Sequence, residues 1–95
     1  MAAYVISEVE MVEEEAWDHY RRLAADSIAR FGGKYIVRGA DQDVVEGGES
    51  LRKVVIVEFP DMATVKKWYV SDDYANALVY KDRALRRKLV FVEGV

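Results

Sequence analysis

Arg38 follows the run GGKYIV and interrupts a segment whose side chains otherwise alternate as in a β-strand. A guanidinium can hold a carboxylate through two parallel hydrogen bonds, so Arg38 is a candidate catalytic or anchoring residue for an anionic ligand. The alternative is a structural ion pair, within the sheet or across a dimer, with Glu8, Glu58 or Glu93, which share its predicted sheet face. Because buried charges must be paired, we favour the ion pair.

The segment WYVSDDY gathers aromatic and hydroxyl side chains around a break between two helical patterns. Aromatic bodies with polar tips suit a small organic ligand, and amides at the start of a helix can receive an anion. We therefore predict ligand contacts for Trp68, Tyr69 and Ser71, and proton transfer for Tyr74. Alternatively, Ser71 is only an N-cap and the aromatic rings fill the gap between helices and sheet. The sequence favours neither reading.

His19 and Glu46 are the remaining candidates for acid–base chemistry. His19 is the only histidine, and its ordinary pKa lies near neutrality. It falls at the edge of the apolar stripe of a predicted helix, where the rim of a pocket would place it for catalysis. Glu46 lies in a polar loop and would act as a ligand contact or general base only if burial raised its pKa. For both we favour an ordinary surface residue.

The residue types exclude several kinds of site. With no cysteine and one histidine, the chain cannot form a disulfide framework, an iron–sulfur site or the usual zinc site. It also lacks a dinucleotide fingerprint, a phosphate-binding loop and a nucleophile elbow. A Ser/His/Asp triad would have to use His19, and no serine context supports it. We expect neither a metal nor a cofactor.

Composition points to one soluble globular domain over residues 1–95. The chain is 52% hydrophobic and 33% charged, with a net charge of -3. It has no basic field for nucleic acid, so we expect no such partner. The start MAAYVISEVE does not resemble a signal peptide, and no apolar run approaches the length of a membrane span. We therefore expect a cytoplasmic protein without membrane contact.

Periodicity predicts a βαββαβ order whose second helical region is broken near Ser71. This is the ferredoxin-like arrangement, an α+β fold with a four-stranded antiparallel sheet and helices on one face. From right-handed crossovers we expect the first and third strands to be central and parallel to each other. A polar connection with a Gly47-Gly48 turn joins the second and third strands. The predicted strands are Ala3 to Val9, Lys34 to Ala40, Lys53 to Phe59 and Lys88 to Gly94, and the first helix is Val12 to Phe31.

Side-chain alternation divides these strands into two faces. One face is almost wholly apolar and includes Val37, Val90 and Val92, so we assign it to the helices. The other mixes charges, Arg38 among them, with too many apolar residues for a solvent face. We predict that a second copy covers it through a two-fold axis. The predicted homodimer interface contains Tyr4, Ile6, Ile36, Val54, Ile56, Leu89 and Phe91.

The motifs GGKYIVRG, VVEGG, VVIVEFPD, KKWYVSDDY and VFVEGV resemble, in order and spacing, a small bacterial family known as domain of unknown function thirteen-thirty. The resemblance implies a ferredoxin-like protomer of the dimeric α/β barrel superfamily, whose two sheets form a barrel. Asp72 departs from the proline of many members, and Lys81 from the more usual arginine. The matching positions are Arg38, Gly39, Glu46, Gly47, Glu58, Phe59, Trp68, Tyr69, Ser71 and Tyr74.

Two functions follow as hypotheses. The superfamily includes cofactor-free monooxygenases, muconolactone isomerase-like enzymes and ligand-sensing domains, so fold kinship selects no single reaction. The first hypothesis is small-molecule binding between sheet and helices, with cofactor-independent enzyme activity on a small anionic or carbonyl compound. The alternative is a non-catalytic dimeric module that binds a metabolite or a partner. Clustering of polar residues at strand ends and at the helix break favours the first.

Overall fold

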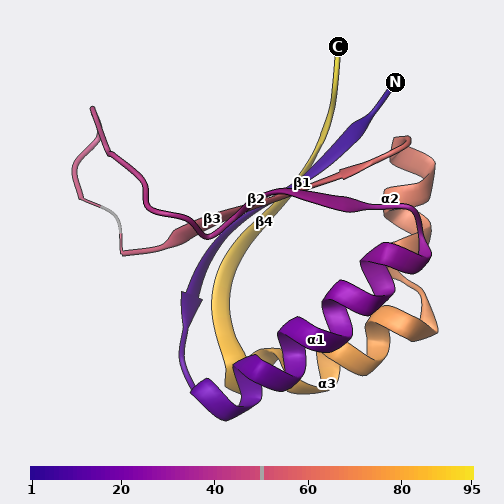
Figure 1. Ribbon diagram of the computed structural model, residues 1–95, viewed down its shortest axis with the longest axis horizontal. Coiled ribbons are helices and arrows are strands. Elements are labelled where there is room, and N and C mark those ends of the chain that lie inside the picture. The colour runs from indigo at the N-terminus through magenta and orange to yellow at the C-terminus, as the bar shows by residue number, and fades with distance from the viewer. Residues whose placement is uncertain (50) are drawn as a thin grey trace.

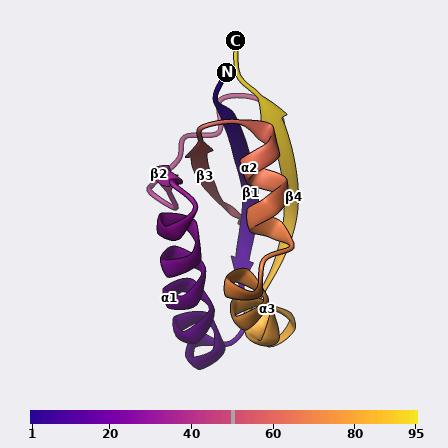
Figure 2. The same ribbon diagram turned by 90° about the vertical axis from the view of Figure 1, so that its right-hand side faces the viewer.

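The computed structural model describes residues 1–49 and 51–95 and has the ferredoxin-like α+β architecture that the sequence predicts. Three helices lie on one face of a four-stranded sheet (Figures 1 and 2). The elements are β1 (Ala3–Met11), α1 (Glu14–Arg30), β2 (Lys34–Arg38), β3 (Lys53–Phe59), α2 (Met62–Tyr69), α3 (Asp72–Ala84) and β4 (Leu85–Glu93).

The sheet has the strand order β2-β3-β1-β4, and every neighbouring pair is antiparallel. The expectation that the first and third strands are parallel was therefore wrong, since Ala3 lies opposite Phe59 and Val9 lies opposite Lys53. The physical reason is that the right-handed crossover through α1 relates β1 to β2. β3 then inserts between these two strands in the opposite direction.

Local signals end α1 and begin α2 and α3 close to where the sequence predicts, whereas α1 begins at Glu14 instead of Val12. Gly32 follows α1 with a φ of 75°, a conformation that glycine adopts without strain. The Asp61 carboxylate accepts the Thr64 amide at 2.8 Å, and the Thr64 hydroxyl and amide lower the pKa of Asp61. Ser71 Oγ accepts the Tyr74 amide at 3.1 Å and donates to the Trp68 carbonyl at 2.7 Å. Ser71 is thus an N-cap that fixes the break between α2 and α3.

A bulge in β2 moves Arg38 to the helix side of the sheet. Tyr35 lies opposite Val57 and Val37 lies opposite Ile56, so Ile36 is an extra residue in the ladder. Beyond the bulge Arg38 lies opposite Val55, which faces the helices. The predicted placement of Arg38 on the open face was wrong, because one inserted residue reverses the alternation of everything after it.

The alternation of β4 also differs from the prediction. Phe91 lies opposite Val5 and Leu89 lies opposite Ser7, so both side chains point toward the helices and pack against the core. Val90 and Val92 lie on the open face and are 37% and 41% exposed. Leu89 and Phe91 were therefore wrongly assigned to the interface. Both faces of β4 carry apolar residues, so its composition alone does not fix its register.

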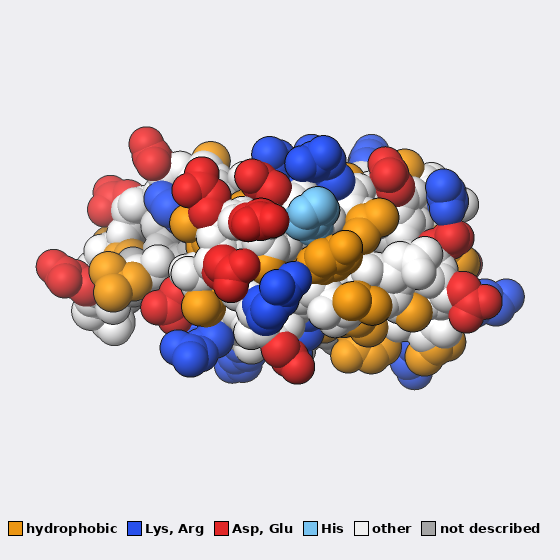
Figure 3. Space-filling view, turned by 90° about the horizontal axis from the view of Figure 1, so that it is seen from below, with side chains coloured by type: hydrophobic (Ala, Val, Ile, Leu, Met, Phe, Trp, Pro, Cys, Tyr) orange, Lys and Arg blue, Asp and Glu red, His pale blue; other side chains and the backbone are white. Residues whose placement is uncertain are grey.

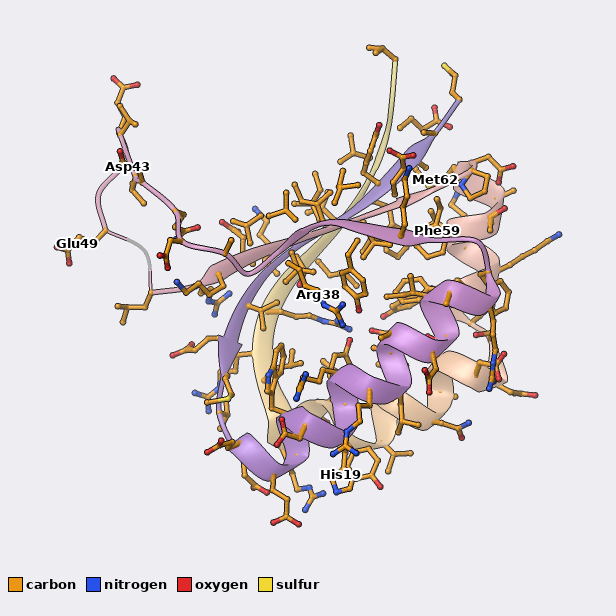
Figure 4. The ribbon with its side chains drawn as sticks, viewed as in Figure 1. His19, Arg38, Asp43, Glu49, Phe59 and Met62 are labelled. Carbon is orange, nitrogen blue, oxygen red and sulfur yellow. The ribbon has the colours of Figure 1, made fainter. Side chains whose placement is uncertain are left out.

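The connection between β2 and β3 projects beyond the sheet edge (Figure 1) and carries Asp43 and Glu49 far from the helices (Figure 4). Its described residues, 39–49 and 51–52, form neither helix nor strand, and Ser50 lies outside the described residues. Among the residues described, no helix has the length and apolar character needed to cross a bilayer.

The close approach of Gly33 to the core gives a test of the packing. A Cβ at Gly33 would lie 2.7 Å from Phe59 and 2.8 Å from Ile28, and the backbone there does not have a positive φ. We expect Gly33→Ala to lower the free energy of unfolding by about 1–3 kcal/mol through overpacking, as measured by urea denaturation. Adding Phe59→Leu should cost less than it does in the wild-type protein. Strict additivity of the two changes would contradict this account.

Candidate functional site

A cavity of about 590 Å³ lies between the sheet and α1. Its walls are mainly apolar, and the aliphatic side chains of the three strands β1, β3 and β4 face an aromatic and aliphatic surface of α1. The apolar lining comprises Val5, Val9, Val55, Val57, Leu85 and Leu89 from the sheet and Trp17, Ala24 and Ile28 from α1.

Nine polar or charged side chains line this cavity, namely Ser7, Glu14, Asp18, Tyr20, Arg21, Tyr35, Arg38, Lys53 and Arg87, and five of them form its polar part against the sheet and α1. Ser7 comes from β1, Tyr20 from α1, Tyr35 and Arg38 from β2, and Arg87 from β4. Arg38 points from the sheet into the space below it, toward α1 (Figure 4). An apolar cavity with a few convergent polar groups is the usual form of a small-molecule site.

Arg87 is held by two tyrosine hydroxyls. Its Nη1 donates to the Tyr20 oxygen at 2.7 Å, and its Nη2 donates to the Tyr74 oxygen at 2.8 Å. The two hydroxyl oxygens lie 2.7 Å apart and share a hydrogen bond. Burial lowers the pKa of Arg87, but the two tyrosines more than offset it, so the net direction is upward. The guanidinium is therefore a fixed positive charge in this cavity.

The cavity tyrosines are held in their neutral form. Burial raises the pKa of Tyr20 far above its ordinary value, Tyr74 raises it further, and Arg87 opposes the change. Burial also raises the pKa of Tyr35, against the effect of Arg38. Both hydroxyls thus keep their protons at neutral pH and can donate hydrogen bonds.

Arg38 has no carboxylate partner among the described residues. Its guanidinium lies 4.0 Å above the centre of the Tyr35 ring, a cation–π contact. Glu58, one of its predicted partners, lies 3.8 Å from Lys34 instead. The ion-pair alternative for Arg38 is therefore not seen in the described part of the chain.

Ser7 is a buried hydroxyl in the cavity wall, with an exposed fraction of 5%. No described protein atom hydrogen-bonds to its Oγ. It lies between Val55 and Leu89 at the centre of the sheet. A buried hydroxyl without a partner carries a desolvation cost that a polar ligand atom would relieve.

The aromatic candidates lie together, but only one lines the cavity. Trp68 contributes to the wall, and its Nε1 donates to Ser27 Oγ at 2.9 Å. Tyr74 is fully buried behind Arg87, with its ring 4.2 Å from that of Trp68. Tyr69 lies outside the cavity, edge-on to Phe91 at 5.5 Å. Of these aromatic candidates, Trp68 therefore forms part of the cavity wall, and Tyr69 and Tyr74 pack outside it.

The structure does not bring His19 or Glu46 to the cavity. His19 is exposed on the outer side of the helices (Figures 3 and 4), where its ring stacks on Tyr80 at 4.9 Å. Glu46 is exposed on the connection between β2 and β3. Across residues 1–49 and 51–95, no cluster of acidic and histidine side chains is arranged to hold a metal ion.

Sequence reasoning missed Ser7, Tyr20, Tyr35 and Arg87. Neither Tyr20, within the predicted first helix, nor Arg87, just before the predicted last strand, was a candidate site residue. One signal for Arg87 was available. It lies midway between Leu85 and Leu89, so in a strand that begins earlier than predicted its side chain points to the same face of the sheet as these two core residues.

Solved structures with this fold come from several bacteria. A protein of unknown function from Rhodopseudomonas palustris has 20% sequence identity and a TM-score of 0.81, with 99% of this chain and 82% of that chain covered. A dimeric ferredoxin-like protein of unknown function from a Jannaschia species has 16% identity and a TM-score of 0.69, with coverages of 99% and 100%.

SnoaB, a cofactor-independent oxygenase from Streptomyces nogalater, has 10% identity and a TM-score of 0.65, with 99% of this chain and 93% of that chain covered. These likenesses show the fold. No curated protein matches the chain. The model of the family described as Domain of unknown function (DUF1330) matches residues 2–95, and the chain therefore belongs to that family, as its motifs predicted.

Proposed function

We propose that this protein binds a small anionic or carbonyl compound in the cavity between the sheet and α1. The observation that carries the proposal is that two of the guanidiniums in this largely apolar cavity, Arg38 and Arg87, come from the sheet, whereas the third, Arg21, is paired with Asp18. Neither Arg38 nor Arg87 has a carboxylate within salt-bridge distance in the described part of the chain. A charge in such surroundings is stabilised by an opposite charge, and a guanidinium binds a carboxylate more strongly than it binds neutral acceptors.

The acidic residues that line the cavity do not neutralise the positive charges of Arg38 and Arg87. Glu14 and Asp18 line it from the first turns of α1, and Asp18 already accepts a hydrogen bond from Arg21 at 3.0 Å. The two guanidiniums come from the sheet side, on β2 and β4. An anionic group of a ligand therefore fits against the sheet, and its apolar body fits against Trp17 and Ile28.

The same site has features that suit cofactor-independent chemistry of the monooxygenase or isomerase type. Neutral Tyr20 and the positive Arg87 can stabilise negative charge that develops on a carbonyl oxygen during a reaction. Tyr74 hydrogen-bonds to both of these groups and so retains a role in the proposed site. A fold shared with a cofactor-independent oxygenase is consistent with this chemistry.

A non-catalytic binding module is the second candidate, and the protonation of the cavity favours it. The pKa values of Tyr20, Tyr35 and Arg87 are all raised, so these groups keep their protons at neutral pH. They can donate hydrogen bonds but cannot remove a proton from a substrate. Catalysis would therefore need a substrate that is already ionised, or Glu14 or Asp18 as the base.

We further propose that the protein is a cytoplasmic homodimer whose two open sheet faces pack together. On the open face the structure has Val90 and Val92 in place of Leu89 and Phe91, and the bulge at Ile36 brings Val37, which was expected to face the helices, opposite Ile56 on that face. The open face carries Tyr4, Ile6, Val37, Val54, Ile56, Val90 and Val92, a contiguous apolar surface of the kind that a partner covers. The similar Jannaschia protein is described as dimeric.

Replacing Arg38 tests the ligand site. Native and denaturing mass spectrometry of freshly purified protein should reveal a dissociable small acid, and Arg38→Met should lower its occupancy. Loss of one charged hydrogen bond corresponds to about a tenfold weaker affinity or more. Arg22→Met, on the exposed side of α1, serves as the matched control and should leave occupancy unchanged. Full ligand retention by a folded Arg38→Met variant would remove Arg38 from the site.

A charge on the open face tests the dimer. We expect Val90→Asp to convert the dimer into a monomer in sedimentation velocity, because two carboxylates would be buried in one interface. Val79→Asp on the outer side of α3, where the valine is 75% exposed, should leave the dimer intact. A wild-type monomer, or a Val90→Asp variant that stays dimeric, would overturn the proposed interface.

A further inference from the structure

The three-way cluster of Arg87, Tyr20 and Tyr74 determines where its hydroxyl protons point. Arg87 only donates, so each tyrosine oxygen uses one lone pair to accept from it. The two hydroxyls share one hydrogen bond, which uses one of their two protons. The other proton must find an acceptor elsewhere.

The surroundings of the two rings decide which hydroxyl keeps the free proton. If Tyr20 donated to Tyr74, the remaining proton would sit on Tyr74, which is fully buried, does not line the cavity, and has no other hydroxyl partner in the described residues. That arrangement would leave a buried donor unsatisfied. If Tyr74 donates to Tyr20, the remaining proton sits on Tyr20, which lines the cavity.

We infer that the Tyr20 hydroxyl donates a hydrogen bond to an oxygen of the bound ligand, and that Arg87 and Tyr74 are positioning residues that turn this O–H into the cavity. This inference rests on the proposed function and deepens it. With both lone pairs of Tyr20 occupied by donors, its hydroxyl acts only as a donor. The ligand atom it meets is therefore an acceptor, such as a carbonyl or carboxylate oxygen.

The positions of the other polar groups define the class of ligand. Arg38 extends from β2, and Arg87 holds Tyr20 near β4, at the opposite edge of the sheet. The fork of Arg87 already holds two tyrosine oxygens, whereas the one contact of the Arg38 guanidinium within residues 1–49 and 51–95 is with the face of Tyr35. Arg38 is thus the anchor for a carboxylate. The site accordingly takes an apolar-bodied carboxylic acid with a second acceptor oxygen at its far end.

Two carboxylates of nearly equal shape test this assignment, namely 4-acetylbenzoate and 4-isopropylbenzoate. Both carry the anion for Arg38, but only the first has a carbonyl oxygen opposite it. Calorimetric titration of the wild-type protein should show about fivefold tighter binding of 4-acetylbenzoate, the value of one hydrogen bond. Tyr20→Phe should abolish this preference, and Arg38→Met should weaken both probes equally.

The variant Tyr74→Phe separates the two proton arrangements. In the arrangement inferred here Tyr74→Phe removes the donor that turns the Tyr20 proton into the cavity, so the preference for the acetyl probe falls below its wild-type value. In the opposite arrangement the preference is absent from the wild-type protein and appears only in Tyr74→Phe, which overturns the inference. Binding of both probes with no preference in any variant also overturns it, while the anion site itself stands.

Failure of both probes to bind would count against the proposed function but not against the inferred proton arrangement. Neutron diffraction from crystals grown in D₂O tests that arrangement directly and needs no ligand. Deuterium on the Tyr74 hydroxyl should lie between the two tyrosine oxygens, and deuterium on Tyr20 should point into the cavity. Deuterium of Tyr20 directed at Tyr74 would refute the assignment, whatever the binding data show.

Discussion

The hydrogen bonds of the partly buried Arg87 guanidinium are the interaction on which the candidate site depends. A charge withdrawn from water needs hydrogen-bond partners, and Arg87 has two of them, Tyr20 on α1 and Tyr74 on α3. One side chain of β4 is therefore tied to both long helices across the core. Burial raises the pKa of Tyr20 in this cluster, although Arg87 acts in the opposite direction, so the Tyr20 hydroxyl keeps its proton and can donate.

The elements of the fold were largely predictable because their signals are local. Glycine after α1, Asp61 before α2 and Ser71 before α3 act through hydrogen bonds or backbone angles within a few residues of themselves. The orientation of the strands and the faces they present are not local. The bulge at Ile36 becomes visible only when Val37 is seen opposite Ile56, and the register of β4 only when Phe91 is seen opposite Val5.

The candidate site was predictable only in part, for the same reason. Arg38 and Trp68 were named from the sequence, but Arg38 was placed on the wrong face because the bulge was not foreseen. Tyr20 and Arg87 acquire their roles only through contacts over 54 and 67 residues of chain. In isolation Tyr20 is one more apolar position on a helix, and Arg87 is one more basic residue.

The alternation of β1 places the proposed ligand site and the proposed dimer face on opposite sides of the sheet. Ser7 faces the cavity, whereas its neighbour Ile6 lies opposite Ile56 and Val90 on the open face. A single sheet thus separates the proposed ligand from the proposed subunit partner, and no cavity residue has to serve both. The bulge in β2 has the same effect at the sheet edge, because it sends Val37 to the open face and Arg38 to the cavity. The inserted residue Ile36 is therefore the reason that the positive charge of Arg38 lies in the cavity.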